Sequence, residues 1–287
     1  MRSFLPHYEL RAPGDLKAVL RLLAEPAAGW RPFAGGTDLM VLFESGRLPP
    51  GKYVSLWGLA PLSGIEVGTA AVTLGALTTY TDVLAHPVLR SEFPLLARAA
   101  GETGGIATQN RGTLGGNIAN ASPAADSPPA LLVYDAELEL ISLGGSRRVP
   151  YHQFHTGYKR MDLRPDEIIS RITLPRGRAA WRQAYRKVGT RKAQAISKVC
   201  LAAAADMDGG VIRDLRIAFG SVAPIVTRCA HAEASVRGRQ PDAATREAAR
   251  RALGRDIAPI DDLRSTAEYR MRVAENLLIQ FLSELTP

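Results

Sequence analysis

Apolar and polar residues alternate in short runs over the first 175 positions, and Gly or Pro interrupts most runs. Alternation with a period of two is typical of half-buried strands, whereas apolar spacing of i, i+3, i+4, i+7 is typical of helices. The pattern predicts strands at residues 30–34, 52–56, 64–67, 72–76, 138–142, 147–149 and 168–174. It predicts helices at residues 15–24, from 39, from 79 or 81 to 85, at 93–100 and from 128.

The pattern changes near residues 175–180, where we place a domain boundary. Three longer strand-rich segments follow, at 181–188, 196–207 and 211–221, and Asp208-Gly209-Gly210 joins the last two as a hairpin. Helices are then expected at 228–237 and 245–255 and after Ser265, which pairs with Glu268 in a predicted capping box. The chain is therefore expected to be α+β, and its second domain a three-stranded antiparallel sheet with helices on one side.

One glycine-rich segment, Thr108–Asp126, interrupts the first half of the chain and carries almost no large apolar side chain. We therefore predict that it lies outside the hydrophobic core. Glycine lets another molecule approach the backbone closely, and successive free N–H groups form a nest for anions. The segment is thus a candidate phosphate site or, as a plainer alternative, a Gly/Asn/Ser surface loop.

A second candidate anion site is Gly35-Gly36-Thr37-Asp38, between a predicted strand and a predicted helix. Its plainer reading is a tight turn with a helix N-cap. Two such segments in one domain suit a ligand with two phosphates, and Asp126 suits a polyhydroxylated chain. A flavin dinucleotide has both features, and Lys187 is a candidate cation for its reduced ring; other dinucleotides remain open.

Composition is that of a globular protein, with 46% hydrophobic and 22% charged residues, a net charge of +8 and a pI near 9.8. Seven basic residues and no acid occur between Arg176 and Lys192. This basic cluster could contact a nucleic-acid backbone, an anionic cofactor or an acidic partner surface, or it could be a solvated face. No apolar run approaches the length of a membrane helix and residues 1–10 lack a secretory signal, so we expect a cytoplasmic protein.

Motifs for catalysis by side chains alone are absent from the sequence. Cys200 and Cys229 are far apart, so neither a disulfide framework nor an iron–sulfur site held by this chain is expected. The five histidines show no metal-ligand spacing, and no nucleophile elbow, Walker A loop or G-x-G-x-x-G occurs. Any chemistry must therefore come from a cofactor.

The paired segments FAGGTDLM (residues 33–40) and RGTLGGNIANASPAAD (residues 111–126) sharpen this interpretation. In this order and spacing they resemble the flavin-binding signatures of the FAD-binding medium subunit of molybdenum hydroxylases, the xanthine dehydrogenase, aldehyde oxidase and carbon monoxide dehydrogenase family. The resemblance covers essentially the whole chain. Its later segments, including LRIAFGSVAPIVTRCAHAE and STAEYRMRVAENLL, are most similar to the separate flavin subunit of bacterial xanthine dehydrogenases.

The resemblance implies a vanillyl-alcohol-oxidase-type (PCMH-type) FAD-binding domain over residues 1–177, in subdomains of about 1–57 and 58–177, and a C-terminal domain over 178–287. It implies that Asp126 lies on the ribityl side, Ile169 against the flavin ring system, and Lys187, or its neighbour Arg186, near the ring. The implied FAD-binding residues are Phe33, Ala34, Gly35, Gly36, Thr37, Asp38, Thr108, Gly112, Thr113, Leu114, Gly115, Gly116, Asn117, Ala121, Ser122, Asp126, Ile169 and Lys187.

The resemblance also implies partners. A large subunit would carry the molybdopterin cofactor and the substrate site, and a small subunit two [2Fe–2S] clusters whose electrons pass to FAD and then to NAD⁺ or another acceptor. Residues 107–112 depart from the usual family pattern before the second glycine motif, which leaves the acceptor open. Two alternatives remain: a stand-alone FAD oxidoreductase of the same fold, and a nucleic-acid or regulatory module that uses the basic cluster.

Overall fold

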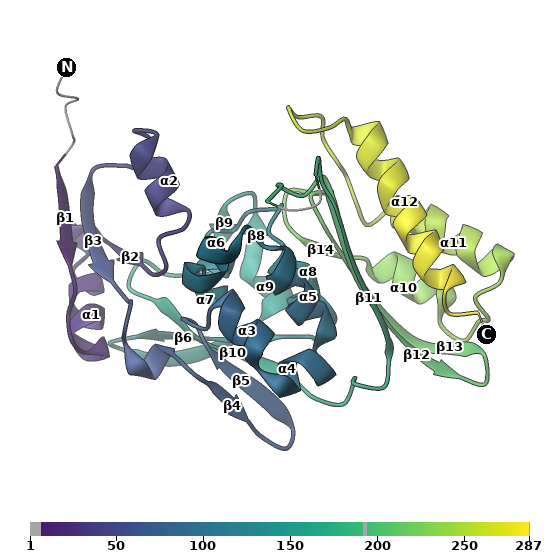
Figure 1. Ribbon diagram of the computed structural model, residues 1–287, viewed down its shortest axis with the longest axis horizontal. Helices are drawn as coiled ribbons and strands as arrows, with labels where there is room; N and C mark the ends of the chain where they lie inside the picture. The colour runs from purple at the N-terminus through teal and green to yellow at the C-terminus, as the bar shows by residue number, and fades with distance from the viewer. Residues whose placement is uncertain (1–6, 192–193, 287) are drawn as a thin grey trace.

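The structure, a computed structural model, describes residues 7–191 and 194–286 and contains three hydrophobic cores in a row (Figure 1). The N-terminal core lies under a parallel sheet of order β1-β3-β2. Val19, Leu20 and Leu23 of α1 pack into it, and the Asp15 side chain caps that helix by accepting from the amide of Ala18. The elements of this part are β1 (Tyr8–Arg11), α1 (Leu16–Leu23), η1 (Pro26–Ala28), β2 (Trp30–Phe33), α2 (Leu39–Glu44), β3 (Gly51–Ser55) and η2 (Ala60–Leu62).

A five-stranded antiparallel sheet of order β4-β5-β10-β6-β7 forms the middle of the molecule. Helices pack on it around Tyr134, Phe93 and Phe154, all fully buried. Its strands are β4 (Ile65–Val67), β5 (Ala71–Gly75), β6 (Glu137–Ser142), β7 (Gly145–Pro150) and β10 (Ile168–Pro175). The accompanying elements are α3 (Tyr80–Ala85), α4 (Pro87–Glu92), α5 (Pro94–Glu102), α6 (Ile106–Arg111), α7 (Leu114–Ala119), α8 (Ser127–Val133), α9 (Tyr151–Phe154), β8 (His155–Gly157) and β9 (Arg160–Met161).

The C-terminal part is an antiparallel sheet between two layers of helices. Helices α10 and α12 pack on one face, and α5 and α8 of the middle part contact the other. Helices cover both faces of β12, so successive residues of this strand are buried whichever face they occupy. This explains its Ala-rich sequence. The elements are β11 (Arg182–Val188), β12 (Val199–Asp208), β13 (Val211–Gly220), β14 (Thr227–Arg228), α10 (Ala230–Val236), α11 (Ala243–Leu253) and α12 (Ala267–Ser283).

The predicted α+β class and the helices after the sheet are confirmed, with two corrections. The C-terminal sheet has four strands in the described part of the chain, not three, because Thr227–Arg228 pairs with β13. A strand of two residues leaves no alternation in the sequence. The last helix is capped by Thr266, which accepts from the amide of Tyr269, so the predicted Ser265–Glu268 capping box is wrong by one residue at its cap.

The prediction that Thr108–Asp126 lies outside the core is also wrong. The segment forms the end of α6, all of α7 and the N-cap of α8, and Leu114 and Ile118 of α7 are fully buried in the middle core. Gly115 is buried as well, against the backbone of Ala76. The small residues of α7 allow the helix to pack closely on the sheet, and they also allow a ligand to approach the backbone. A count of large apolar side chains does not reveal such packing.

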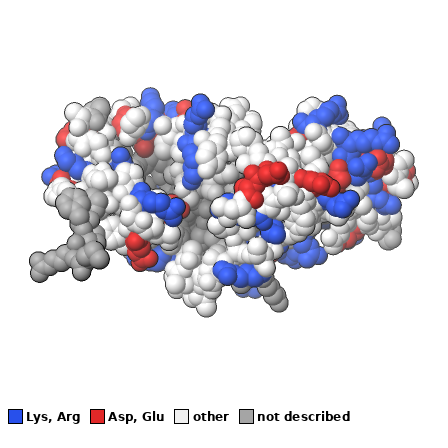
Figure 2. Space-filling model, turned by 90° about the horizontal axis from the view of Figure 1, so that it is seen from above, with Lys and Arg blue, Asp and Glu red and all other residues white. Residues whose placement is uncertain are grey.

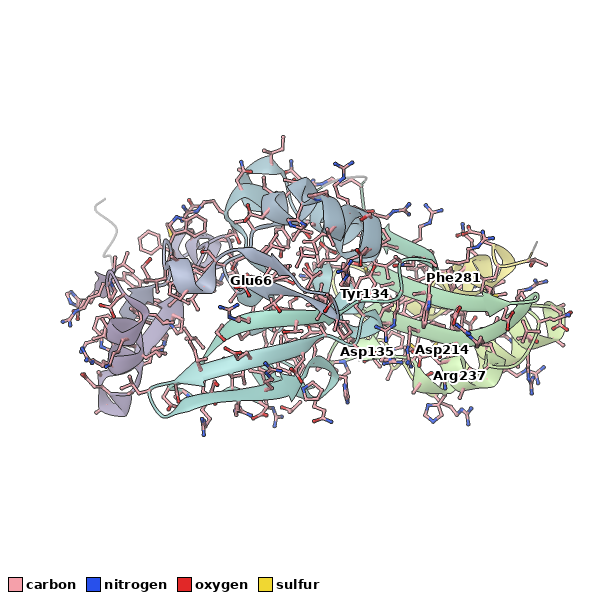
Figure 3. The ribbon with its side chains drawn as sticks, turned by 90° about the horizontal axis from the view of Figure 1, so that it is seen from below. Glu66, Tyr134, Asp135, Asp214, Arg237 and Phe281 are labelled. Atoms are coloured by element: carbon pink, nitrogen blue, oxygen red, sulfur yellow. The ribbon has the colours of Figure 1, made fainter. Side chains whose placement is uncertain are left out.

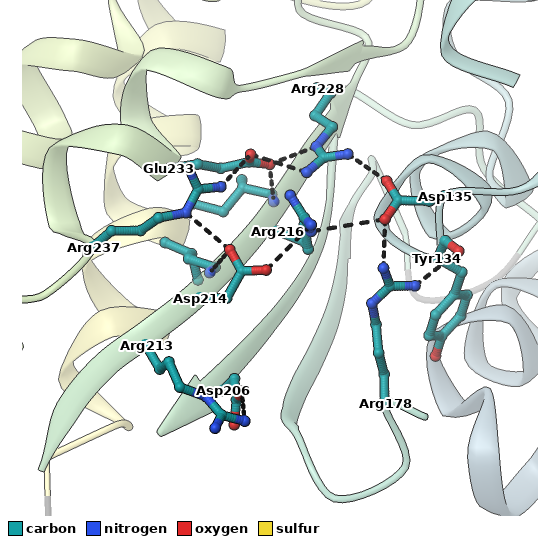
Figure 4. A network of polar contacts seen from close by, with 12 residues as sticks. Tyr134, Asp135, Arg178, Asp206, Arg213, Asp214, Arg216, Arg228, Glu233 and Arg237 are labelled. Carbon is teal, nitrogen blue, oxygen red and sulfur yellow. Dashed lines mark hydrogen bonds and ion pairs between the residues drawn. The ribbon is translucent and has the colours of Figure 1, made fainter. Parts of the chain in front are cut away.

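An ion-pair network joins the middle part to the C-terminal sheet, centred on Asp135 (Figures 3 and 4). Its carboxylate accepts from Arg178 at 2.5 Å and from Arg228 at 2.5 Å, and Arg216 lies 3.8 Å away. Arg228 in turn pairs with Glu233 of α10. Asp135 follows α8 and adopts φ = 52°, which is uncommon outside Gly, Asn and Asp. The network therefore fixes how the C-terminal sheet sits on the helices that contact it.

Candidate functional site

A cleft of about 390 Å³ opens where the loop after β2, helix α7 and strand β10 come together. Figure 2 shows the molecule from above, with a hollow between its N-terminal part and the remainder. Both glycine segments line the cleft, although they are far apart in the sequence. The sequence-predicted site residues that line it are Ala34, Gly35, Gly36, Thr37, Asp38, Gly112, Thr113, Gly115, Gly116, Asn117 and Ile169.

The two glycine segments meet at Gly35. A Cβ at this position would lie 1.7 Å from the carbonyl oxygen of Arg111, so only glycine allows the contact. Gly36 adopts φ = +79°, a conformation that favours glycine, and a Cβ there would meet the ring of Phe33 at 2.7 Å. The glycines therefore bring two loops into backbone contact and keep the cleft wall free of side chains.

Backbone donors in the cleft belong mainly to the first glycine segment. Among the described residues, no other backbone group accepts from the amides of Gly35, Gly36 or Thr37. The amides of the second segment are used inside the protein, because those of residues 114, 115 and 117 donate to backbone carbonyls and that of Gly116 to the Thr113 hydroxyl. Most amides of residues 113–117 are thus occupied, and only that of Thr113 has no acceptor within the described chain. The adjacent free donors lie at residues 35–37.

The remaining cleft surface suits a large, partly polar ligand. Asn117 lines the cleft, and its buried Oδ1 has no hydrogen-bond partner within the described chain. An unpartnered buried polar atom in a cleft marks a place where a ligand can bond. Leu77 and Ile169 add apolar lining. Free amides, an orphaned amide oxygen and apolar walls together fit a dinucleotide with an apolar ring system such as FAD.

Several predicted residues support the cleft and do not line it. The Phe33 ring packs beneath Gly36, and Leu114 is fully buried in the core. Thr108 accepts from the amide of Gly112 through its carbonyl at 2.6 Å, and Ser122 accepts from the amide of Ala124 in the next turn. The predicted residues outside the cleft lining are Phe33, Thr108, Leu114, Ala121, Ser122, Asp126 and Lys187.

Asp126 and Lys187 contact each other, and neither of them lines the cleft. Lys187 Nζ donates to Asp126 Oδ2 at 2.6 Å and to the Glu102 carbonyl at 2.8 Å, and both side chains are buried. Burial raises the pKa of Asp126 to about 6, although the Lys187 ammonium acts in the opposite direction. The desolvation of the carboxylate therefore outweighs its short contact with Lys187. Cys200 and Tyr185 complete this buried cluster, since Cys200 donates to the Tyr185 hydroxyl, which donates to the Asp126 carbonyl.

Tyr80 connects the Asp126 cluster to the cleft and was not among the predicted site residues. Its ring lines the cleft beside Gly112, and burial together with the Asp126 carboxylate raises its pKa well above the usual range for tyrosine. Asp126 therefore lies behind the cleft wall and not in it. Tyr80 follows a predicted N-cap and resembles one more apolar helix residue, so no sequence pattern indicates its place in the cleft wall.

Two charged cleft residues, Glu167 and Lys159, were also missed. Hydrogen bonds from Arg147 hold the pKa of Glu167 at about 2, and its carboxylate also pairs with Arg164. Lys159 lies in the tight turn between β8 and β9. That short hairpin was not predicted because its strands contain three and two residues.

Ion pairs neutralise much of the basic cluster of residues 176–192. Arg176 pairs with Glu92, Arg178 with Asp135 and Lys187 with Asp126. Lys192 lies outside the described residues. Basic and acidic side chains are interspersed over the face seen in Figure 2. The face shown in Figure 2 carries no continuous positive stripe of the kind that binds along a nucleic-acid backbone.

Two known protein families together match nearly the whole chain. Residues 6–177 match the family described as FAD binding domain in molybdopterin dehydrogenase, and residues 183–285 match the CO dehydrogenase flavoprotein C-terminal domain. The xanthine dehydrogenase FAD-binding subunit of Escherichia coli O157:H7 is 33% identical over 253 residues, which cover 88% of this chain and 87% of that protein. The glyceraldehyde dehydrogenase medium chain of Sulfolobus acidocaldarius is 29% identical and covers 98% of this chain and 99% of its own length.

Solved structures show the same fold. A chain of carbon monoxide dehydrogenase from Hydrogenophaga pseudoflava superposes with a TM-score of 0.93 at 28% identity, covering 99% of this chain and 100% of that one. A chain of quinoline 2-oxidoreductase from Pseudomonas putida 86 gives a TM-score of 0.90 at 26% identity, with 98% of both chains covered. The expected two-part architecture is therefore confirmed. Within the described residues, no helix is long and apolar enough to cross a membrane.

Proposed function

Because the chain belongs to the family of FAD-binding medium subunits of molybdenum hydroxylases, we propose that it is the electron outlet of such a complex. It receives electrons from the two [2Fe–2S] clusters of a small subunit and passes them to NAD⁺ or another acceptor. The organic substrate is oxidised at the molybdopterin cofactor of a large subunit, so this chain contributes no catalytic residue of its own to that step. FAD supplies the electron-carrying chemistry when it is bound.

The observation that carries this proposal is the row of free amides at Gly35, Gly36 and Thr37 in a cleft of about 390 Å³. Three adjacent N–H donors of the described chain, unused by its own backbone, suit the oxygens of a diphosphate. A ligand without negative charge would leave these donors without an acceptor of comparable strength. The proposal therefore assigns the diphosphate of FAD to residues 35–37.

The other cleft residues orient and enclose the cofactor. Gly115 and Gly116 allow the ligand to approach helix α7, and Asn117 Oδ1 accepts a hydrogen bond from it. Ile169 provides an apolar surface for the flavin ring system. Asp126 and Lys187 lie behind Tyr80 and do not line the cleft. We assign Asp126 to the ribityl side of FAD, and we propose that Lys187 supplies positive potential that stabilises the reduced flavin ring.

A titration of the full chain with FAD tests the proposal, followed by anaerobic reduction in the presence of its partner subunits. One FAD per chain is expected, and bleaching of the flavin absorbance when the hydroxylase substrate is added to the complex. An isolated chain that oxidises an organic donor without partners would favour a stand-alone oxidoreductase. A chain that neither contains nor takes up FAD would contradict the proposal outright.

A further inference from the structure

The two-residue turn between β8 and β9 places Lys159 at the rim of the cleft. The register pairs Gly157 with Arg160, so Tyr158 and Lys159 form the whole turn. Lys159 adopts φ = 54°, in the left-handed region where Gly, Asn and Asp are favoured and Lys is uncommon. A strained position that carries a long basic side chain indicates a role for that side chain.

The ammonium group of Lys159 is held in place by Asn120, the residue after helix α7. Nζ donates to the Asn120 carbonyl at 2.6 Å and to its side-chain Oδ1 at 2.8 Å. Asn120 Nδ2 donates in turn to Asp38 Oδ1 at 3.3 Å. Three segments thus meet at the cleft mouth: the loop after β2, the end of α7 and the β8–β9 turn. An ammonium has three N–H donors, and these two bonds leave one for a ligand.

The charge of the cleft favours a cation at this place. The charged residues in the described lining are Asp38, Glu167 and Lys159. Arg147 and Arg164 neutralise Glu167, whereas Asp38 is exposed and directly follows residues 35–37, with their free amides, in the chain. A diphosphate on those amides would meet Asp38 as a like charge, and Lys159 is the basic side chain on the described wall that can offset it.

We infer that Lys159 is the cationic contact of the cofactor's diphosphate, with Asn120 as the residue that positions it. This inference rests on the proposed function and deepens it. The third N–H of Nζ donates to a phosphate oxygen while the two bonds to Asn120 persist, so the β8–β9 turn is fastened to the cofactor as well as to α7. No covalent bond changes. The left-handed conformation of the turn directs the Lys159 side chain to the rim of the cleft.

The test is an FAD titration of the full chain, freed of flavin, by flavin fluorescence at low and high salt. Lys159→Met removes the charge at similar length, Lys159→Arg retains it, and Lys17→Met is the matched control on the exposed side of α1. Lys159→Met should weaken FAD binding roughly 10-fold at low salt, the effect of one charge-assisted hydrogen bond. The difference should shrink at high salt, while Lys159→Arg and Lys17→Met bind like the parent chain.

The outcomes separate this inference from the proposed function. A parent chain that binds FAD and a Lys159→Met variant that binds it equally well would overturn the role of Lys159 alone. A parent chain that binds no FAD would overturn the proposed function and this inference with it. Lys159→Asn, which suits the left-handed turn, repeats the measurement with the charge removed and the hairpin preserved. It should bind as weakly as Lys159→Met, and parental affinity would overturn the inference.

Discussion

Lys187 Nζ lies 2.6 Å from Asp126 Oδ2, and this buried ion pair joins strand β11 of the C-terminal sheet to the N-cap residue of α8. The two residues are 61 positions apart in the chain. Both are implied by the family resemblance to contact FAD, on the ribityl side and near the ring. In the structure Lys187 pairs with Oδ2 of Asp126 behind the Tyr80 wall, whereas Asp126 Oδ1 is buried without a hydrogen-bond partner in the described chain. The Lys187–Asp126 bond couples the cofactor region to the packing of the C-terminal sheet.

The first prediction concerns pH. The pKa of Asp126 in the folded chain is about 6, above its ordinary value of 3.8. Its contribution to stability is therefore complete below pH 4 and is lost as pH rises through 6, because the unfolded chain releases the proton first. Asp126→Asn removes this dependence. The difference in unfolding free energy between the parent and Asp126→Asn chains, both without flavin, should fall by about 2 kcal/mol between pH 4 and 7. Urea unfolding at a series of pH values measures it, and a constant difference would contradict the assignment.

A second prediction concerns the partner in that pair. Lys187→Met leaves the Asp126 carboxylate buried without its cation and should destabilise the chain by about 3 kcal/mol at pH 7. The loss should be smaller at pH 5, because Asp126 is then protonated and needs no counter-charge. Thermal or urea unfolding at both pH values measures the effect. Equal losses at pH 5 and pH 7 would show that the pair does not control the stability of this region.

A third prediction separates the two neighbouring glycines of α7. A Cβ at Gly115 would lie 2.7 Å from Ala76 Cβ and 2.8 Å from its carbonyl oxygen, so Gly115→Ala should cost about 2 kcal/mol of stability through overpacking. A Cβ at Gly116 meets only the Thr113 hydroxyl at 2.8 Å and Ala34 at 3.9 Å. Gly116→Val should displace the Thr113 hydroxyl that caps α7, cost about 1 kcal/mol of stability, and obstruct FAD.

Unfolding curves and FAD titrations of both variants distinguish these effects. A Gly116→Val chain that folds and retains full FAD affinity would show that the cofactor does not lie against α7. A Gly115→Ala chain as stable as the parent would show that the helix can shift away from Ala76 without cost.

A fourth prediction concerns the Asp135 network. Asp135→Asn removes the charge that three arginines share, at a position whose left-handed backbone asparagine tolerates. It should destabilise the chain by about 2 kcal/mol, since it leaves Arg178 without a charged partner in the described chain and removes one of the two carboxylates that Arg216 and Arg228 each contact. Asp206→Asn, which breaks a pair with the exposed Arg213, is the control and should cost less than about 1 kcal/mol. Equal costs in chemical unfolding would mean that the network does not bind the two parts together.

Much of the fold could be predicted because apolar periodicity and turn residues agree over long segments. The hairpin at Asp208-Gly209-Gly210 joins β12 and β13 as expected, and the apolar face of the last helix is buried at Ala274, Leu278 and Phe281. The elements that were missed are short or packed by small residues. β14 and β9 contain two residues each, and α7 is buried through Leu114, Ile118 and a glycine, a pattern that resembles a loop.

The candidate site was predictable where glycine is required by geometry. Only glycine fits at position 35, where a Cβ would lie 1.7 Å from the Arg111 carbonyl oxygen, and glycine is favoured at position 36, where φ is +79°. Paired glycines of this kind can be recognised in a sequence. The use of each amide could not be predicted, because the carbonyls that occupy the second segment come from Ala76 and Thr78, outside the motif. Lys159 and Tyr80 were missed for the same reason, since only tertiary packing brings them to the cleft.

A crystal structure of the full chain saturated with FAD tests the central claim most directly. The account predicts that the diphosphate oxygens lie within hydrogen-bond distance of the amides of Gly35, Gly36 and Thr37, with the flavin ring against Ile169. A cofactor bound elsewhere, or a cleft that excludes FAD while those amides stay in contact with solvent, would contradict it.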